Sequence, residues 1–451
     1  MARRSIGILV LAIAFFAVAR GQARSDEALT LPLAVEIALR THPMLRATAS
    51  GREIAEAQLQ GARAGRFPVL QFSETLLRGN NPVFVFGSLL EQARFGQRNF
   101  DPRFLNNPDS MTNYRTSLTF RMPVLDQRQN SVKVAQAQFR REQADKRLDQ
   151  MEQQVRFEVL RSYYGVLLAQ AEKEVADEAV RLAEADVKRS RDRSEAGMSV
   201  VADLLSAEVQ LADFRQQQIR AEGEIATALA GLNTAMGLSI DAPQRLSGEL
   251  TDRAFVVAGR EDLIRQAIGN RPDLASAGLA LRERAQQVDG ARGEFLPRVD
   301  VFTSYGLSGR NLWSGSGDYA VGASLTFNIF DAGRKSRIEE ARAAERLAEN
   351  QQQHLTNQIR LEVVRAYQQY HSARERLAVA ERVISHATEA LRIVQDRYHE
   401  GLTTITEVLR AETALVRART NVLAARYDYY VGYAHVLLTT GSLTDVRPFV
   451  S

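Results

Sequence analysis

The chain has 451 residues, of which 45% are apolar and 25% charged, close to the average of folded proteins. This composition excludes a wholly disordered chain, and the length suffices for two or three ordinary domains. The formal net charge of +4 is small. Because Lys and Arg alternate with Asp and Glu along the expected helices, we expect no nucleic-acid partner.

The N-terminus has the pattern of a secretory signal peptide. Two arginines precede the apolar run 6–19, and small-residue triplets ending at Ala19 and Ala23 close it. We expect residues 1–23 to be removed on export. A membrane-anchoring helix is the alternative, but the run is shorter than the about 20 residues that span a bilayer.

Several classes of site are not expected. Cysteine is absent, which excludes disulfides, thiol catalysis and a lipid-anchored cysteine. The six histidines show no metal-ligand spacing, so we predict no metal, no cofactor and no enzyme. The glycine-rich stretch 315–322 runs into a strand rather than a helix and is interpreted as a turn, not a dinucleotide loop. No second long apolar run exists, so a membrane role requires β-strands.

The chain is a tandem duplication. Three pairs of segments align without gaps, namely 42–68 with 271–297, 155–164 with 359–368, and 194–211 with 398–415. A repeat on this scale indicates architecture rather than a single catalytic pocket. We therefore expect a first repeat at 24–240, a linker at 241–260, a second repeat at 261–445 and a tail at 446–451.

Each repeat is predicted to hold a long helical hairpin. Proline is absent from 124–242 and 298–447, and an interior proline would break a helix. We place the hairpins at about 127–236 and 334–440. In the second, a 4-3 spacing of apolar residues predicts a supercoiled seam; it comprises Ile359, Val363, Ala366, Tyr370, Ala373, Leu377, Ala380, Ile384, Ala387, Leu391, Val394 and Tyr398.

Both hairpins are expected to turn at a glycine. Gly197 and Gly401 stand where the long helices stop, and glycine is favoured just past a helix C-terminus. A helix from about 334 to 399 would be about 100 Å long, far beyond a globular core. Thr404 and Glu407 have the spacing of a capping box for the returning helix.

Four segments alternate between large apolar and small polar residues, as strands do when one face meets lipid and the other water. We expect strands at about 69–77, 114–124, 298–307 and 319–330. Four strands cannot close a barrel, and an open edge is forbidden inside lipid. If these strands cross a membrane, several chains must therefore share one barrel.

Two questions stay open from the residues alone. The loop at 78–112, with Phe84 and Phe86, either folds over the mouth of a barrel or packs against a neighbour. The competing interpretation of the whole chain is a soluble periplasmic coiled-coil scaffold or adaptor. That interpretation accounts for the heptads, but it has no need of four alternating strands.

The sequence resembles the TolC-like outer-membrane efflux proteins over essentially the whole mature chain. The matching features are the duplication itself, the stretches 81–95, 290–297 and 325–334, and the two hairpin tips. The resemblance implies a mixed α/β membrane protein whose long hairpins form a tunnel through the periplasm. Its four strands would join those of two other chains in a barrel of 4 × 3 = 12 strands in the outer membrane.

The resemblance also implies partners. A homotrimer would be contacted at its tips by a periplasmic adaptor protein and supplied by an inner-membrane pump, as part of a tripartite efflux or type I secretion system. The residues that match the family's adaptor-docking motif are Gly197, Met198, Ser199, Gly401, Leu402 and Thr403. A plain helix cap explains the two glycines equally well.

The family's closed gate maps onto the same tips. Glu407 stands at the family's acidic ring, and Asp203 is its equivalent in the first repeat. Tyr398 matches a tyrosine that bonds across to the position of Asp203. Two residues depart from the pattern: Thr403 replaces a latch arginine, and Arg410 replaces a second ring aspartate. A weaker cross-link and a less acidic ring follow from these departures.

Overall fold

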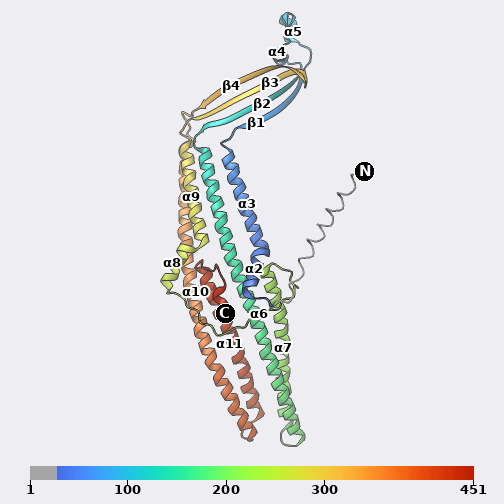
Figure 1. Ribbon diagram of the computed structural model, residues 1–451, viewed down its shortest axis with the longest axis vertical. Helices are drawn as coiled ribbons and strands as arrows, with labels where there is room; N and C mark the ends of the chain where they lie inside the picture. The colour runs from blue at the N-terminus through green and yellow to red at the C-terminus, as the bar shows by residue number, and fades with distance from the viewer. Residues whose placement is uncertain (1–27, 451) are drawn as a thin grey trace, which may run out of the picture. The chain divides into compact units, whose positions relative to one another are not determined.

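The computed structural model describes residues 28–450, so the predicted signal peptide lies outside the described residues. The chain forms two compact units that cut across the two repeats. Unit 1 holds the described residues up to Thr48, Leu148–Pro272 and the chain from Thr356 onward, and unit 2 holds Ala49–Arg147 and Asp273–Leu355. Figure 1 shows helices along most of the chain and one sheet, which belongs to unit 2.

The sheet has four antiparallel strands in the order β1-β2-β3-β4. Both edge strands lack a partner within the described chain. Three strands start within a few residues of the prediction and run somewhat longer than predicted. The strands are β1 (Val69–Gly79), β2 (Met111–Asp126), β3 (Arg298–Asn311) and β4 (Ser314–Thr326).

The predicted bounds of the fourth strand, 319–330, are wrong at both ends. β4 begins at Ser314 because Asn311 makes the turn, its Oδ1 accepting hydrogen bonds from the backbone N–H of Trp313 (3.2 Å) and Ser314 (2.9 Å). The whole stretch interpreted as a turn, 315–322, is therefore strand. β4 ends at Thr326 because its partner there, Arg298, is the first residue of β3.

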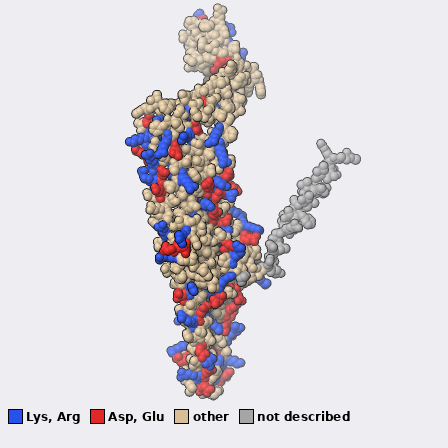
Figure 2. Space-filling view, turned by 60° about the vertical axis from the view of Figure 1, so that its left-hand side comes forward, with Lys and Arg blue, Asp and Glu red and all other residues tan. Residues whose placement is uncertain are grey.

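The two faces of the sheet differ in chemistry. Residues paired across antiparallel strands project to the same side. The apolar face exposes large side chains such as Phe72, Leu118, Tyr305 and Tyr319, and the other, the polar face, holds Asn113, Arg115, Ser117 and their partners. Figure 2 shows charged residues spread over the helices and few over the strands. The apolar face suits lipid.

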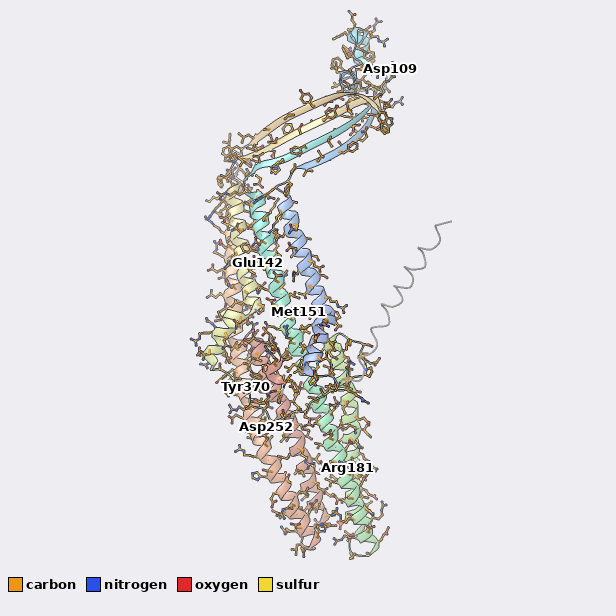
Figure 3. The ribbon with its side chains drawn as sticks, viewed as in Figure 1. Asp109, Glu142, Met151, Arg181, Asp252 and Tyr370 are labelled. Carbon is orange, nitrogen blue, oxygen red and sulfur yellow. The ribbon has the colours of Figure 1, made fainter. Side chains whose placement is uncertain are left out.

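Short helices join β1 to β2. They are α4 (Pro82–Glu91), the 3-10 turn η1 (Gln97–Phe100) and α5 (Pro102–Asn106). Asn81 caps α4 by accepting from the backbone N–H of Val83 (3.0 Å) and Phe84 (3.2 Å), and Pro82 suits the first turn. In Figures 1 and 3, α4, α5 and Asp109 lie at the end of the strands far from the helices of unit 2.

The long helices of the two repeats have equal lengths. α6 (Gln129–Glu195) and α10 (Gly333–His399) have 67 residues each, and they return as α7 (Val201–Met236) and α11 (Ile405–Thr439). Most of the predicted seam of α10 is buried, with Ile359, Val363 and Tyr370 at most 1% exposed, and Ala380, Ile384, Ala387 and Val394 are partly buried. None of the described helices is long and apolar enough to span a membrane.

In both repeats a proline interrupts the helices that precede the first strand. Pro43 separates α2 (Leu31–Thr41) from α3 (Pro43–Ala64), and Pro272 separates α8 (Arg260–Asn270) from α9 (Pro272–Gly293). The residue before each proline is extended, with ψ of 122° and 123°, as the proline ring demands. The duplication seen in the sequence is therefore a duplication of backbone geometry.

The segment predicted as a linker, 241–260, is held in place by tyrosines in unit 1. The hydroxyl of Tyr163 donates to the carbonyl of Ser247, and that of Tyr370 donates to the carbonyl of Phe255 at 2.7 Å. Figure 3 labels Tyr370. Because buried tyrosine hydroxyls need partners, these bonds fix the segment against the helices. The chain then ends in the 3-10 turn η2 (Arg447–Phe449).

Candidate functional site at the hairpin tips

The two tips have the same backbone geometry. Gly197 and Gly401 adopt left-handed φ values of 71° and 73°. The next residue of each tip, Met198 or Leu402, donates its N–H to the carbonyl five residues earlier, both at 2.8 Å. Together with the N–H of each glycine, which bonds three residues back, this is the Schellman closure of a helix end.

The space around the tips is open. A Cβ built on either Gly197 or Gly401 would meet nothing within 4 Å, so backbone conformation rather than packing requires glycine here. Met198 is 66% exposed and Leu402 is 67% exposed, although methionine and leucine are usually buried. Each tip therefore presents one exposed apolar side chain beside bare glycine backbone, while the hydroxyl of Ser199 is buried and has no hydrogen-bond partner among residues 28–450.

The predicted capping box is wrong. Thr404 occupies the N-cap position of α11, but its side chain makes no capping hydrogen bond. The carboxylate of Glu407 instead accepts from Arg410 Nη1 at 2.7 Å, one helical turn away. The two side chains are 49% and 72% exposed, so solvent screens the pair. Arg410 therefore offsets the charge expected for an acidic ring at Glu407.

The predicted contact between Tyr398 and Asp203 is also absent from the described residues. Tyr398 is 7% exposed and packs among Leu391 and Ile405 of its own hairpin. The guanidinium of Arg193, from α6, lies 5.0 Å from the centre of its ring, within cation–π range. Asp203 lies in the first turn of α7, where its charge favours the helix N-terminus.

Thr403, the residue at the latch position, lies just before the N-cap residue of α11. The structure thus brings Gly401, Leu402, Thr403 and Glu407 together at one tip and Gly197, Met198, Ser199 and Asp203 at the other. Tyr398 belongs to the hairpin core, where it meets the first hairpin through Arg193.

Sequence reasoning missed a buried carboxyl pair just behind the tips. Asp186 of α6 is 1% exposed and Glu412 of α11 is 3% exposed, and the two carboxyl groups share a hydrogen bond. Arg189 Nη2 lies 2.9 Å from Asp186 Oδ1. One oxygen of each acid and the hydroxyl of Ser190 have no partner among the described residues. The signal was present, because Asp186 and Glu412 stand at apolar positions of the helical repeat.

Two carboxyl groups in a buried site cannot both stay ionised without a large cost. Burial, followed by the neighbouring charge of Asp186, raises the pKa of Glu412 from 4.5 to about 8. Arg189 and Gln395 act in the opposite direction. At neutral pH Glu412 is therefore protonated and donates to Asp186, which joins α6 to α11.

Other contacts join the two hairpins at this level of unit 1. Gln210 Nε2 of α7 donates to Thr413 Oγ1 of α11 at 3.0 Å. Arg419 of α11 forms an ion pair with Glu178 of α6. The two hairpins thus meet through polar contacts between helices as well as through apolar packing, in which Val416 of α11 lies against Ala179 and Phe214. Such polar contacts can be exchanged for water when helices move apart.

The geometry of the strands and tips has counterparts among known proteins. The family model for outer membrane efflux proteins matches residues 34–238 and 263–442, which is most of the chain and both repeats. The chain belongs to the outer membrane efflux protein family. Membership confirms the predicted fold class, the outer-membrane location and the function of an export channel rather than an enzyme, and it leaves the scaffold interpretation without support.

Individual relatives of this efflux protein are distant. Protein CyaE of Bordetella pertussis is 29% identical over 322 residues, which cover 69% of this chain and 67% of that protein. The proteases secretion protein PrtF of Dickeya chrysanthemi is 24% identical over 93% of this chain and 90% of its own. The CmeC outer membrane channel of Campylobacter jejuni superposes with a TM-score of 0.78 at 16% identity, over 91% and 85% of the chains.

Within residues 28–450, no group of three or more His, Asp or Glu side chains could hold a metal ion. What the arrangement can do is mechanical: two hairpins held together by a protonated acid pair and a cation–π contact can separate or close. At the tips, the exposed side chains of Met198 and Leu402 and the glycine backbone beside them offer a surface for a partner.

Proposed function

We propose that three copies of this efflux protein form one tunnel that carries cargo from the periplasm across the outer membrane. The open sheet is the observation that carries the proposal. β1 and β4 are edge strands with unpaired backbone groups, and the apolar face exposes Phe72, Tyr319 and Val321, the last two at 79% and 72%. Open edges are not tolerated in lipid, so β1 of one copy pairs with β4 of the next.

Engineered cysteines test this pairing, because the chain contains no cysteine of its own. A cysteine replaces Phe72 of β1, and a second one replaces Tyr319, Val321 or Ala323 of β4 in turn. Within one chain β2 and β3 separate these strands by about 14 Å, too far for a disulfide. Oxidation should give covalent dimers and trimers for one of the pairs. Monomers for all three pairs would contradict the proposal.

The tips are proposed to dock a periplasmic adaptor, with an inner-membrane pump behind it. Met198 and Leu402 support this role because both are exposed next to glycine backbone that a partner can approach closely. Gly197, Ser199, Gly401 and Thr403 complete the docking surface. Replacing Met198 and Leu402 by Asp should abolish co-purification with the adaptor while leaving the channel assembled. Retained co-purification would exclude the tips as the docking surface.

The gate is proposed to lie at the same level. Asp203 and Glu407 line the closed end, Arg410 moderates the field of Glu407, and Tyr398 holds the second hairpin through Arg193. Removal of residues 1–23 by signal peptidase is part of the same proposal. N-terminal sequencing of the outer-membrane protein should then start at Arg20 or Arg24.

A further inference from the structure

The helical insert between β1 and β2 lies on the polar face of the sheet. Glu91, the last residue of α4, places its Oε2 at 3.2 Å from Arg115 Nη1. The same oxygen accepts from Asn113 Nδ2 and Ser308 Oγ, each at 3.2 Å. Arg115 and Asn113 alternate with apolar-face residues along β2, and Ser308 pairs with Arg115. All three partners of Glu91 therefore belong to the polar face.

A buried amide fixes the end of α4 more firmly. Gln92 is 7% exposed, and its Nε2 donates to Asn113 Oδ1 at 2.8 Å and to the carbonyl of Gly309 at 3.2 Å. Ser308, at the same level of β3, is fully buried. This end of the polar face is thus covered by protein rather than left open to a water-filled lumen.

Arg115 extends the contact across the sheet. Its Nη2 lies 3.2 Å from Asp318 Oδ1 on β4, two strands away. The pair passes over Gly306 of β3, where an added Cβ would come within 3.0 Å of Asp318 Oδ1 and 3.1 Å of Arg115 Nη2. Glycine at 306 therefore makes the bridge possible. Arg115 joins α4 through Glu91 to the far edge of the sheet through Asp318.

The insert has its own small core. Val85 and Leu89 of α4 pack with Met111, the first residue of β2, and all three are at most 9% exposed. Phe95 makes T-shaped contacts with Phe86 and Phe100, with ring centres 4.8 and 5.0 Å apart. These contacts give the insert a defined shape that can move as one body.

We propose that α4, η1 and α5 form an exit cap, which covers the lumen side of the strands at their outer end and is held by a latch of Glu91, Arg115 and Asp318. The proposal rests on the trimeric barrel proposed above, since three exit caps then converge on one mouth. The latch side chains are 36–46% exposed, so solvent screens their ion pairs. Emerging cargo can therefore break the latch at little cost, whereas the buried hydrogen bonds of Gln92 to Asn113 and Gly309 remain the firmer tie between α4 and the strands.

The reactivity of a thiol on the lumen side of the strands reports whether the exit cap covers the mouth. Gln71 of β1 pairs with Thr119 on the polar face and is exposed, so Gln71→Cys in the cysteine-free chain gives one reactive thiol. Intact cells are treated with a small maleimide and with one that carries a polyethylene glycol chain. The ratio of the two rates (large reagent over small) cancels differences in thiol reactivity. It also does not depend on the hairpin tips, because the reagents arrive from outside.

Arg115→Ala in the Gln71→Cys chain should raise this ratio about tenfold. A tenfold change in the equilibrium between closed and open exit cap corresponds to about 1.4 kcal/mol. Arg121→Ala is the matched control, because Arg121 lies on the same strand and face and loses the same charge but makes no ion pair with the exit cap. Its ratio should stay at the parent value. An unchanged ratio in Arg115→Ala would overturn the exit cap.

Glu91→Gln provides a second variant, which keeps the shape of the side chain and removes its charge from the other end of the latch. It should raise the ratio in the same direction, and it carries the test if Arg115→Ala fails to assemble. A ratio near one already in the parent has a different meaning. It would show that the mouth is uncovered in the parent, which contradicts the exit cap, whereas failure of the proposed function would appear as monomers in the cysteine cross-linking of β1 with β4.

Discussion

The two hairpins share a backbone but differ in the chemistry behind their tips. A shift of 204 residues, the difference between Gly401 and Gly197, superimposes the two turns. The same shift pairs the buried Tyr398 with Ser194. It also pairs Glu412, at 3% exposure, with Glu208, whose side chain is 42% exposed and lies 3.1 Å from Arg191. The turn is the same in both hairpins, but the buried groups behind it differ: the second hairpin contributes Tyr398 and Glu412, and the first contributes Asp186.

The largest effect is expected at Tyr398. Tyr398→Ala should lower the free energy of unfolding by about 3 kcal/mol, because it leaves a cavity beside Leu391 and Ile405 and removes the ring under Arg193. Urea unfolding followed by circular dichroism measures the change. The equivalent change in the first hairpin, Ser194→Ala, should stay within about 0.5 kcal/mol. Equal losses in the two variants would mean that the hairpins do not differ as described.

The next effect depends on pH. The pKa of Glu412 is raised from 4.5 to about 8 in the folded chain. Between these two pH values the folded chain keeps the proton on Glu412, whereas the unfolded chain has lost it. The contribution of Glu412 to stability is therefore complete below pH 4.5, falls as the pH rises, and is lost above about pH 8. Because Arg189 and Gln395 act against the effect of burial on Glu412, we expect a decline of only about 2 kcal/mol.

Two variants separate this contribution from the other acids. Glu412→Gln keeps a side chain that can donate to Asp186 but cannot ionise, so its stability should change little between pH 4.5 and 8. Glu208→Gln, the equivalent change at the exposed position, should keep the decline of the parent chain. A parent whose stability rises over this range would show that Glu412 is ionised in the folded protein.

A smaller and symmetric effect is expected at the turns. Gly197→Ala and Gly401→Ala should each cost about 1–2 kcal/mol, because both positions have positive φ and neither loses packing. Gly165→Ala, inside α6 with open space around it, should instead add up to about 1 kcal/mol. Thermal unfolding measures the loss of stability expected for the two turn variants and the gain expected for Gly165→Ala. A cost at only one tip would argue against equivalent turns.

The smallest effect concerns ion selectivity. Arg410→Ala should free the carboxylate of Glu407 and shift the reversal potential in a salt gradient toward cations, by a few millivolts, because solvent screens charges at an open tip. Glu407→Ala should shift it the other way. Asp203→Asn tests whether the first hairpin contributes a comparable field. Unchanged selectivity in all three variants would exclude the tips as the charged constriction.

Patterns with a strong period were predictable from the sequence. The 4-3 seam of α10 and the two turn glycines need only helix geometry, and the alternation along β1 and β2 needs only the pleat. The predicted start of β4, residue 319, lies after the observed start at Ser314 because the first half of the strand is glycine-rich. This half is a strand because it pairs with β3, and its own residues do not predict it. The end of a strand depends on where its partner ends.

The remaining misses were side-chain contacts, one within a single helical turn and two between segments distant in the sequence. Glu407 fits a capping box by spacing, yet the nearby Arg410 competes for its carboxylate and wins. The contact of Arg193 with Tyr398 and the pairing of Asp186 with Glu412 join residues of different repeats. An acid at an apolar helical position signals burial, but its partner appears only once the helices are packed.

The central claim, that one chain supplies a third of a barrel, is tested most directly by native mass. The protein is extracted from outer membranes in mild detergent and weighed after correction for bound detergent. A chain of 50.2 kDa predicts a particle of three chains, 3 × 50.2 = about 151 kDa before loss of the signal peptide. A monomer recovered from the soluble periplasm would contradict the account, because the sheet would then never meet lipid.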